Sequence, residues 1–330
     1  MHALSQQDGD SSRPCVSVII PAYNTASLIS ECLNSVFSQT YKDFEAIVVN
    51  DGSPDTPELE RVLHPYLSRI VYIRQENKRA AGARNTAIGI ARGEFLAFLD
   101  SDDTWLPDHL SNQMQLFADD PSLDLVYADG LMVGTPGRKE SRFMDRCPSR
   151  GPATFEALIY ERCQVSVSTA VARKSAIVRA GLFDESLLRC DDYDMWVRTA
   201  FYGGKIGYRR TVQARFAEGR PGSLGQSAVK MAEAYCLILE KFIRTLPLDP
   251  PTLELVRKRL AETKAIYRIV EAKHLLAEGK YDTARKLLAE ANQHYRSAKL
   301  GLILAGLKLV PSTTGKLASL WTRFLERRAQ

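Results

Sequence analysis

The 330-residue sequence lacks long hydrophobic runs, paired cysteine motifs and the common phosphate-binding loops. No run reaches the ~18 apolar residues of a membrane-spanning helix, so we expect no such helix. The six cysteines occur without a CxxC pair, which is typical of reduced thiols in a cytoplasmic protein. Neither GxxxxGK(S/T) nor GxGxxG is present, which excludes a P-loop and a dinucleotide-binding fingerprint.

The composition is otherwise that of a soluble globular protein, with 45% hydrophobic and 25% charged residues. Charge is unevenly distributed along the chain. Residues 226–330 hold 19 Lys and Arg against 10 Asp and Glu, whereas the rest of the chain holds 25 against 29. The basic C-terminal third indicates either contact with an acidic surface, such as anionic lipid, or a solvated helical face.

The sequence pattern changes twice along the chain. Residues 1–14 are polar without an apolar core, so we expect a disordered leader and not a signal peptide. Residues 15–225 alternate between strand and helix patterns, and residues 226–330 are helical throughout. Within the helical region, residues 272–292 resemble one tetratricopeptide-type hairpin, whereas a solenoid needs about three. The apolar segment 298–311 is expected to be buried against the main domain, with a membrane interface as the alternative.

Strands and helices alternate five times in the first 130 residues. The expected strands are Val16–Ile20, a run ending at Asn50, residues 69–77, Phe95–Leu99 and residues 123–130, with helices at Ser27–Phe37, Ala80–Ala91 and Leu106–Ala118. This alternation predicts an α/β fold with a parallel sheet. Downstream, VSVSTAVAR (165–173) is expected to be a further strand.

The run GEFLAFLDSDDTW contains an acidic turn directly after a buried strand. Asp100, Asp102 and Asp103 then lie at the rim of the sheet, where open α/β folds bind ligands. Crowded carboxylates repel one another unless a cation neutralises them, and Mg²⁺ or Mn²⁺ prefers oxygen ligands. The turn therefore predicts a metal-assisted site for a phosphate-bearing substrate. The alternative is a solvated turn in which Asp102 or Asp103 caps the next helix.

Three further loops follow strands or open helices at the same edge of the predicted sheet. They contain Pro21 to Tyr23, Asp51, and the stretch from Arg79 to Arg84. Because the carboxyl ends of parallel strands meet at one edge, we expect these residues to lie beside Asp100 to Asp102. With no phosphate loop available, a diphosphate at this edge is expected to be held by a metal and arginines.

Four segments, found in order, resemble glycosyltransferase family 2: VSVIIPAYN, VVNDGSPD, RAAGARNTAIGIARGEFLAFLDSDD and FDESLLRCDDYDMWVR. The similarity covers roughly residues 15–225. It implies the GT-A fold, in which a Rossmann-like, mostly parallel central sheet is flanked by helices, here with a C-terminal all-helical appendage. It also implies an inverting transfer from a nucleotide-diphospho-sugar.

The resemblance assigns donor-binding roles to residues of the four loops. Asp51 would accept a hydrogen bond from the nucleotide base, and Pro21 and Tyr23 would line the nucleoside pocket. Asp100 would reach the ribose beside Ser101, and Asp102 of this DXD motif would hold Mn²⁺ or Mg²⁺. Arg84 and Arg79 would contact the base or phosphates. Asp103 is assigned to the helix that follows. As alternatives, Asp51 is a plain turn residue, Tyr23 a packing residue and Arg84 an exposed helix residue.

The resemblance places the catalytic base in CDDYDMW, on Asp192 beside Asp191. Adjacent carboxylates raise each other's pKa, which suits a base that takes a proton from a sugar hydroxyl. Both residues also suit the N-terminus of a helix. Trp196, one turn further on, is expected to be either an apolar platform for the acceptor or a core residue.

One position departs from the family pattern. Related members often carry His before PGS, where it completes the metal shell, but this chain has Arg220 there. Arginine cannot ligate a cation, although it can contact a diphosphate. The QxxRW pattern of processive synthases is absent, which disfavours a polymer-extruding enzyme.

These observations predict a metal-dependent glycosyltransferase that moves one sugar from a nucleotide donor, with UDP the expected carrier. The expected acceptor is a polysaccharide or lipid-linked glycan intermediate at the cytoplasmic membrane face, with peripheral contact through the basic C-terminal helices and no nucleic-acid partner. One alternative is a catalytically silent sugar-nucleotide-binding or scaffold protein. Another is a sugar nucleotidyltransferase, although VSVIIPAYNTASL lacks the Gly-rich basic signature expected for that class.

Overall fold

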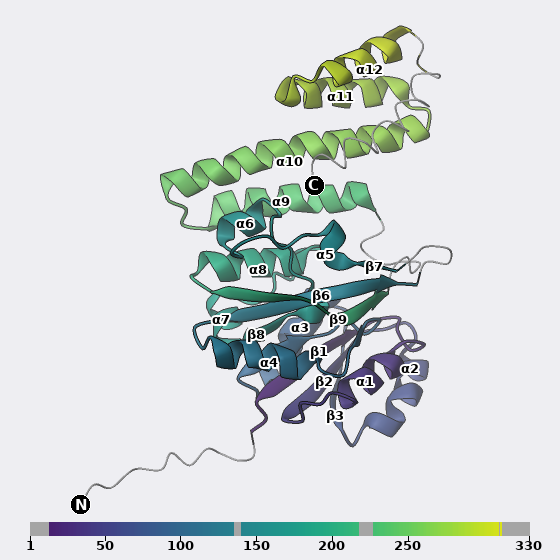
Figure 1. Ribbon diagram of the computed structural model, residues 1–330. Coiled ribbons are helices and arrows are strands. Elements are labelled where there is room, and N and C mark those ends of the chain that lie inside the picture. The colour runs from purple at the N-terminus through teal and green to yellow at the C-terminus, as the bar shows by residue number, and fades with distance from the viewer. Residues whose placement is uncertain (1–12, 135–139, 218–226, 310, 312–330) are drawn as a thin grey trace, which may run out of the picture. The chain divides into compact units, whose positions relative to one another are not determined.

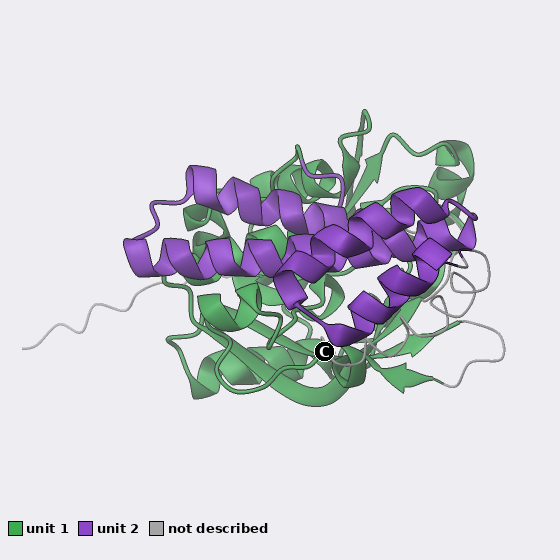
Figure 2. Ribbon diagram, turned by 90° about the horizontal axis from the view of Figure 1, so that it is seen from above, with its two compact units in different colours: residues 1–186, 191–220 green, residues 187–190, 221–330 purple. Residues whose placement is uncertain are grey.

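A computed structural model describes residues 13–134, 140–217, 227–309 and 311 (Figure 1). The chain divides into two compact units, which Figure 2 colours separately. Unit 1 comprises residues 1–186 and 191–220, and unit 2 comprises residues 187–190 and 221–330. Arg220 lies outside the described residues, so its predicted role stays a prediction.

The first half of the sheet in unit 1 is parallel, as the sequence pattern predicts. Strands run in the order β3-β2-β1-β4, and every neighbouring pair is parallel. The elements are β1 (Val16–Ala22), α1 (Ile29–Phe37), β2 (Phe44–Asp51), α2 (Thr56–Leu63), a 3-10 turn (His64–Tyr66), β3 (Ile70–Gln75), α3 (Arg79–Ile90) and β4 (Phe95–Phe98). Val18, Ile20, Val48 and Ala97 are fully buried, because both faces of these strands are covered.

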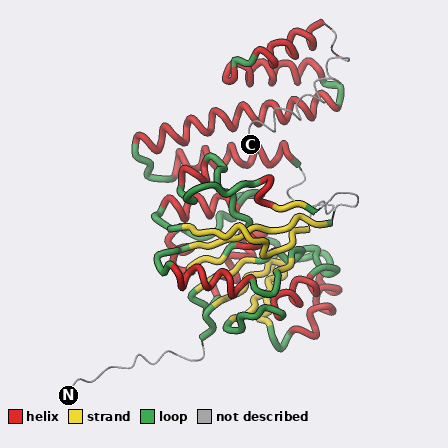
Figure 3. Tube along the Cα trace, viewed as in Figure 1, coloured by secondary structure: helices red, strands yellow, loops and turns green. Residues whose placement is uncertain are grey.

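The second half of the sheet is mixed, which corrects the expectation of a mostly parallel sheet. Its elements are β5 (Thr104–Trp105), β6 (Leu125–Val133), β7 (Ser141–Arg142), β8 (Val171–Arg173) and β9 (Ile206–Ala217). β8 lies between β4 and β6 and runs antiparallel to both, whereas β9 runs parallel to β6. Figure 3 shows these strands in yellow with helices on both faces of the sheet.

Two boundaries differ from the pattern-based expectation. Of the expected strand 165–173, only β8 is extended, because Val167–Thr169 form a 3-10 turn. Helix α4 (His109–Asp119) begins at His109 with Asp108 at its N-cap position, so neither Asp102 nor Asp103 caps it. The remaining helices of unit 1 are α5 (Phe143–Arg146), α6 (Phe155–Ile159), α7 (Lys174–Arg179) and α8 (Asp191–Phe201).

Unit 2 contains α9 (Ala228–Thr245), α10 (Pro250–Ala277), α11 (Tyr281–Tyr295) and α12 (Ala298–Leu309). The apolar face of α12 packs into a cluster with α10 and α11. The cluster consists of Ala272, Leu276, Ala284, Leu288, Leu300, Ile303 and Leu307. Leu302 and Leu309, on the opposite side, are 71% and 80% exposed. Within the described ranges, no helix combines the length and apolarity needed to cross a membrane.

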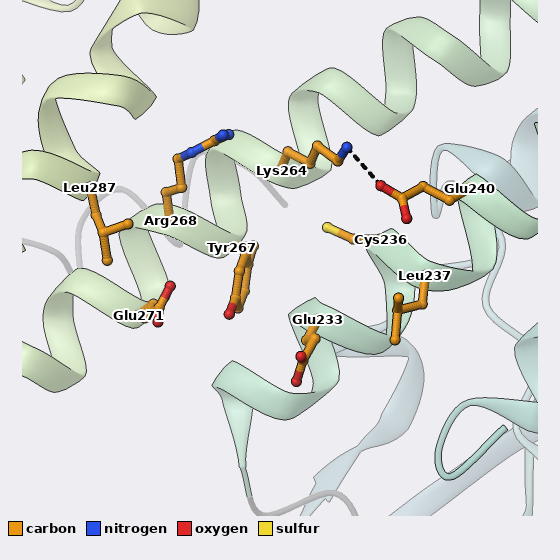
Figure 4. Close-up of a pocket in the computed structure, with 9 residues that line it drawn as sticks. All are labelled: Glu233, Cys236, Leu237, Glu240, Lys264, Tyr267, Arg268, Glu271 and Leu287. Atoms are coloured by element: carbon orange, nitrogen blue, oxygen red, sulfur yellow. Dashed lines mark ion pairs between the residues drawn. The ribbon is translucent and has the colours of Figure 1, made fainter.

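A pocket of about 290 Å³ lies between α9, α10 and α11 (Figure 4). Its cations are paired: Lys264 Nζ lies 2.7 Å from Glu240, and Arg268 Nε lies 2.7 Å from Glu290. Burial raises the pKa of Tyr267, and the nearby charges of Glu271 and Glu233 raise it further.

Candidate active site

Asp51 ends β2 and is held in place by the loop between β3 and α3. It is 2% exposed, and its Oδ1 accepts hydrogen bonds from Gln75 Nε2 and the Lys78 backbone N–H, both at 2.8 Å. The next residue, Gly52, has φ +63°, a left-handed conformation that glycine adopts without strain. Because the described residues leave Oδ2 without a hydrogen bond, that oxygen can accept one from a ligand.

The loop after β1 is tied to the loop after β2. Ser53 Oγ accepts from the Asn24 backbone N–H at 2.7 Å, and Asp55 Oδ2 accepts from the Ala26 backbone N–H at 2.8 Å. Tyr23, within the first loop, is 50% exposed and therefore able to contact a ligand. These bonds connect the two loops that follow the neighbouring parallel strands β1 and β2, next to Tyr23 and Asp51.

The acidic turn after β4 is organised by Ser168, which precedes β8. Ser168 Oγ accepts from the Asp100 backbone N–H at 3.2 Å and donates to Asp103 Oδ2 at 2.6 Å. Asp103 Oδ1 also accepts from the Ala217 backbone N–H at 2.9 Å. Burial raises the pKa of Asp103 well above its usual range, and the charges of Asp102 and Asp100 add to this. Asp103 therefore fixes the turn to β8 and β9, and does not serve α4 as expected.

Arg84 joins the acidic turn to the beginning of α8. Its side chain is 4% exposed, and its two terminal nitrogens lie 2.6 Å from Asp100 Oδ1 and 2.6 Å from Asp191 Oδ2. Burial alone would lower the pKa of Arg84, but the charges of Asp100 and Asp191 outweigh burial and raise it. Arg84 is thus held by two carboxylates, and the expectation that it contacts the base or phosphates stays a prediction. The alternative of an exposed helix residue is wrong.

Asp191 and Asp192 occupy the first turn of α8. The pKa of Asp192 is raised to about 7, chiefly by burial and also by the charge of Asp191, while the charge of Arg84 opposes the shift. Burial also raises the pKa of Asp191, against the opposing effect of its ion pair with Arg84. A carboxyl with a pKa near neutrality can accept a proton at working pH and release it afterwards.

Trp196 is 1% exposed and lies in the core of unit 1. Its ring centroid lies 5.7 Å from that of Phe98 and 5.9 Å from that of Phe183, both edge to face. Such geometry is that of packed aromatic side chains. The expectation of an exposed acceptor platform is therefore wrong, and the core alternative holds.

Comparison with known proteins identifies the domain that carries this geometry. The model of "Glycosyl transferase family 2" matches residues 17–176. Residues 17–176 form a glycosyltransferase family 2 domain. The chain is also 31% identical over 195 residues to an uncharacterized glycosyltransferase of Methanocaldococcus jannaschii, covering 58% of this chain and 66% of the relative. This chain covers 31% and 58% of the length of the next two relatives. In each of these three relatives, a third or more of the length therefore lies outside the matched region.

Solved structures share the fold over nearly the whole chain. S. aureus TarS in complex with UDP-GlcNAc superposes with a TM-score of 0.60 at 20% identity, over 93% of this chain and 91% of that chain. The mannosyltransferase PcManGT from Pyrobaculum calidifontis, in complex with GDP-Man and Mn²⁺, superposes with a TM-score of 0.59 at 24% identity, over 94% and 88%. The chain thus has the GT-A fold with a mixed central sheet, followed by C-terminal helices.

The resemblance assigns the metal ion to Asp102 of the acidic turn, and this assignment stays a prediction. Asp100 is paired with Arg84, and both oxygens of Asp103 accept hydrogen bonds. Among the residues that the structure describes, no cluster of three His, Cys, Asp or Glu side chains forms a complete metal site. Mg²⁺ and Mn²⁺ often use one or two carboxylates and take their remaining ligands from substrate phosphates and water, so the donor set fits a cation shared with substrate.

Sequence reasoning missed the polar residues that orient the site of the family 2 domain. Gln75 holds Asp51, Ser168 holds Asp100 and Asp103, and Thr25 Oγ1 lies 3.0 Å from the buried Ser101 Oγ. Ser, Thr and Gln are frequent in loops and carry no distinctive pattern, so no signal in the sequence marks them. Of the two expected arginines at this edge, Arg79 remains exposed at the first position of α3.

Proposed function

We propose that this protein is an inverting, metal-dependent glycosyltransferase that moves one sugar from a nucleotide-diphospho-sugar to a hydroxyl acceptor. The observation that carries the proposal is the Asp191–Asp192 pair at the start of α8, in which Asp191 is buried and Asp192 half-buried, and which Arg84 links to the acidic turn after β4. A proton acceptor and a donor-binding edge thus lie within one connected set of side chains. A silent binding protein would have no need of a base with a pKa near 7.

A nucleotide fits the edge formed by β1, β2 and β4. Asp51 offers Oδ2 to an N–H of the base, as a uracil N–H would require. Tyr23 offers a half-exposed aromatic ring, and we assign contact with the ribose hydroxyls to Asp100. The neighbours' bound UDP-GlcNAc and GDP-Man support a nucleotide-sugar donor, and the family resemblance favours UDP.

The reaction we assign to these residues is a single in-line displacement. Asp192 takes the proton of the acceptor hydroxyl while the hydroxyl oxygen forms a bond to the anomeric carbon of the donor. The bond from that carbon to the diphosphate oxygen breaks, its electron pair stays on the diphosphate, and the configuration inverts. When bound at Asp102, a divalent cation supplies charge neutralisation for the departing diphosphate.

The acceptor we propose is a polysaccharide or lipid-linked glycan intermediate at the cytoplasmic face of a membrane. Two features of unit 2 support this placement: the basic excess after residue 226, and the exposed Leu302 and Leu309 on α12. Basic residues beside exposed apolar side chains favour peripheral binding to anionic lipid.

The test is a panel of UDP- and GDP-sugars assayed for release of the nucleoside diphosphate, with Mn²⁺ or with EDTA. We expect turnover with one donor in Mn²⁺ alone. We expect Asp192→Asn to lower turnover by ~10²–10⁴-fold, because general-base catalysis contributes about that much. Binding of the donor to this variant, measured by calorimetry, should be unchanged. Asp120→Asn, an exposed carboxylate, is the matched control. Full turnover by Asp192→Asn would remove the base assignment, and binding without turnover by the wild type would favour the silent alternative.

A further inference from the structure

Helix α3 contacts both the acidic turn and the chain around α8 through two consecutive polar residues. Arg84 pairs with Asp191 at 2.6 Å. Asn85 donates from Nδ2 to the Phe183 carbonyl at 2.8 Å and accepts from the Phe183 backbone N–H at 3.0 Å. The Arg84 guanidinium also lies 5.5 Å from the Phe183 ring centroid. The position of α8 therefore depends on α3.

The two ion pairs of Arg84 go to different elements, which a single guanidinium can join because its nitrogens form a rigid fork. One nitrogen reaches Asp100, at the end of β4, and the other reaches Asp191. In the described part of the chain, Nε has no hydrogen-bond partner. A lysine ammonium is a single centre and cannot reproduce this bridge.

Arg198 provides a comparison within the same domain. It is also buried and pairs with Asp194 at 2.6 Å, while donating to the Ala180 and Leu182 carbonyls. All of its partners are structural, whereas both partners of Arg84 belong to the proposed site. Desolvation makes a buried ion pair a weak source of stability, so the value of the Arg84 bridge lies in its geometry.

We propose that Arg84 is a positioning residue that fixes the first turn of α8 relative to the donor-side carboxylate Asp100. This inference rests on the proposed function. Arg84 holds Asp191, and this contact also fixes the backbone of the next residue in the same turn, Asp192, to which the proton transfer is assigned. Donor contact at Asp100 and proton removal at Asp192 are thereby coupled through one side chain.

The test compares Arg84→Met, Arg84→Lys and the control Arg198→Lys by three measurements. The first is amide hydrogen exchange of residues 191–195 without substrate, the second is affinity for UDP with MnCl₂, and the third is kcat and KM for the donor. Arg84→Lys retains the buried charge, and it is the variant to be measured if Arg84→Met does not fold.

We expect Arg84→Met to exchange at least ~tenfold faster in the first turn of α8, because it loses the contact that fixes that turn. We expect kcat to fall ~100-fold with KM and UDP affinity within ~threefold, since a displaced base costs that much in rate. Arg84→Lys should recover part of both losses, and Arg198→Lys should leave kcat within ~threefold, because its partners lie outside the site.

Unchanged exchange in α8 of Arg84→Met overturns the inference whatever the reaction is. A tenfold loss of UDP affinity with unchanged α8 exchange also overturns it, because Arg84 would then be a donor-binding residue. If the wild type transfers no sugar but α8 exchange responds as expected, the proposed function fails while the positioning of α8 by Arg84 is supported.

Discussion

Asp192 is half-buried and His109 fully buried, and loss of contact with water shifts their pKa values in opposite directions. Asp192 acts as a base only when ionised. Because its pKa is raised to about 7, the protonated and inactive form accumulates below pH 7. We therefore predict that kcat/KM falls ~tenfold per pH unit below that point and is flat above it. A pH–rate profile from pH 5.5 to 9 measures this. A decrease of kcat/KM that begins only as the pH approaches the ordinary pKa of Asp would contradict the prediction.

His109 ties stability to pH. Its ring stacks on Trp105 with centroids 4.4 Å apart, and neither ring nitrogen has a hydrogen-bond partner in the described residues. Burial lowers its pKa to about 3, from an ordinary value of about 6.5. The unfolded chain therefore binds the proton more readily, and the stability present above pH 6.5 is lost as the pH falls towards 3.

We predict that His109→Phe raises the free energy of unfolding by ~1–3 kcal/mol at pH 8, because a buried unsatisfied polar group is removed. At pH 5 the gain should be larger by ~2 kcal/mol, which is the cost of keeping the ring neutral there. Urea unfolding at both pH values measures this. His274→Phe, on an exposed side chain, is the control, and an equal gain at both pH values would contradict the account.

The carboxylates of the site could be predicted from the sequence, but the fate of Arg84 could not. Asp51 and Asp100 follow apolar strands, so the rule for parallel sheets places them at one edge. Arg84 lies in α3, where Ala81, Ala83 and Ala87 are buried as well. The sequence periodicity of this helix therefore does not indicate which of its faces is buried. Pairing with Asp191, 107 residues away, is a tertiary contact without a local signal.

At the scale of elements, the turn from β2 depends on a close approach to the loop before α3. A Cβ added to Gly52 would lie 2.7 Å from the Asn77 backbone nitrogen, and Gly52 has φ +63°. We predict that Gly52→Ala displaces the loop that hydrogen-bonds Asp51 and weakens UDP binding at least ~tenfold, as expected for a strained residue that moves a binding group. Calorimetry with UDP and MnCl₂ measures this.

Gly89 supplies the control. It lies within α3, and a Cβ there would meet no atom within 4 Å. Gly89→Ala should leave UDP affinity unchanged and stabilise the protein by ~0.5–1 kcal/mol, the usual gain in a helix interior. Equal UDP affinities for the two variants would show that the turn at Gly52 does not position Asp51.

The strand order shows where local pattern stops being informative. Alternating strand and helix patterns correctly predicted that β1 to β4 run parallel, although they did not predict the order β3-β2-β1-β4. The strand at β8 was predicted but its antiparallel direction could not be, because β8 has only three residues, Val171–Arg173, and its neighbours β4 and β6 are both far from it in sequence. The direction of a strand in a sheet is set by the path of the connecting chain, and the residues of a short strand do not indicate that path.

At the scale of the whole molecule, the charge asymmetry and the exposed face of α12 belong to unit 2. Residues 226–330 contribute the entire basic excess of the chain. The helix buries Leu300, Ile303 and Leu307 against α10 and α11 while Leu302 and Leu309 stay exposed. The expected burial partner was the α/β domain, whereas the structure gives α12 partners within the helical unit. The apolar residues that this packing leaves exposed are those available to a lipid surface.

We predict that the protein sediments with vesicles containing anionic lipid at low salt and is released at high salt, because basic residues within a Debye length supply the attraction. Leu302→Asp should lower the partitioning at least ~tenfold, since it removes an inserted leucine and adds a repelled charge. Val178→Asp, on an exposed side chain of α7, is the control and should bind as the wild type does. Equal losses in both variants would assign the binding to net charge alone, and no sedimentation at low salt would remove the membrane from the proposed function.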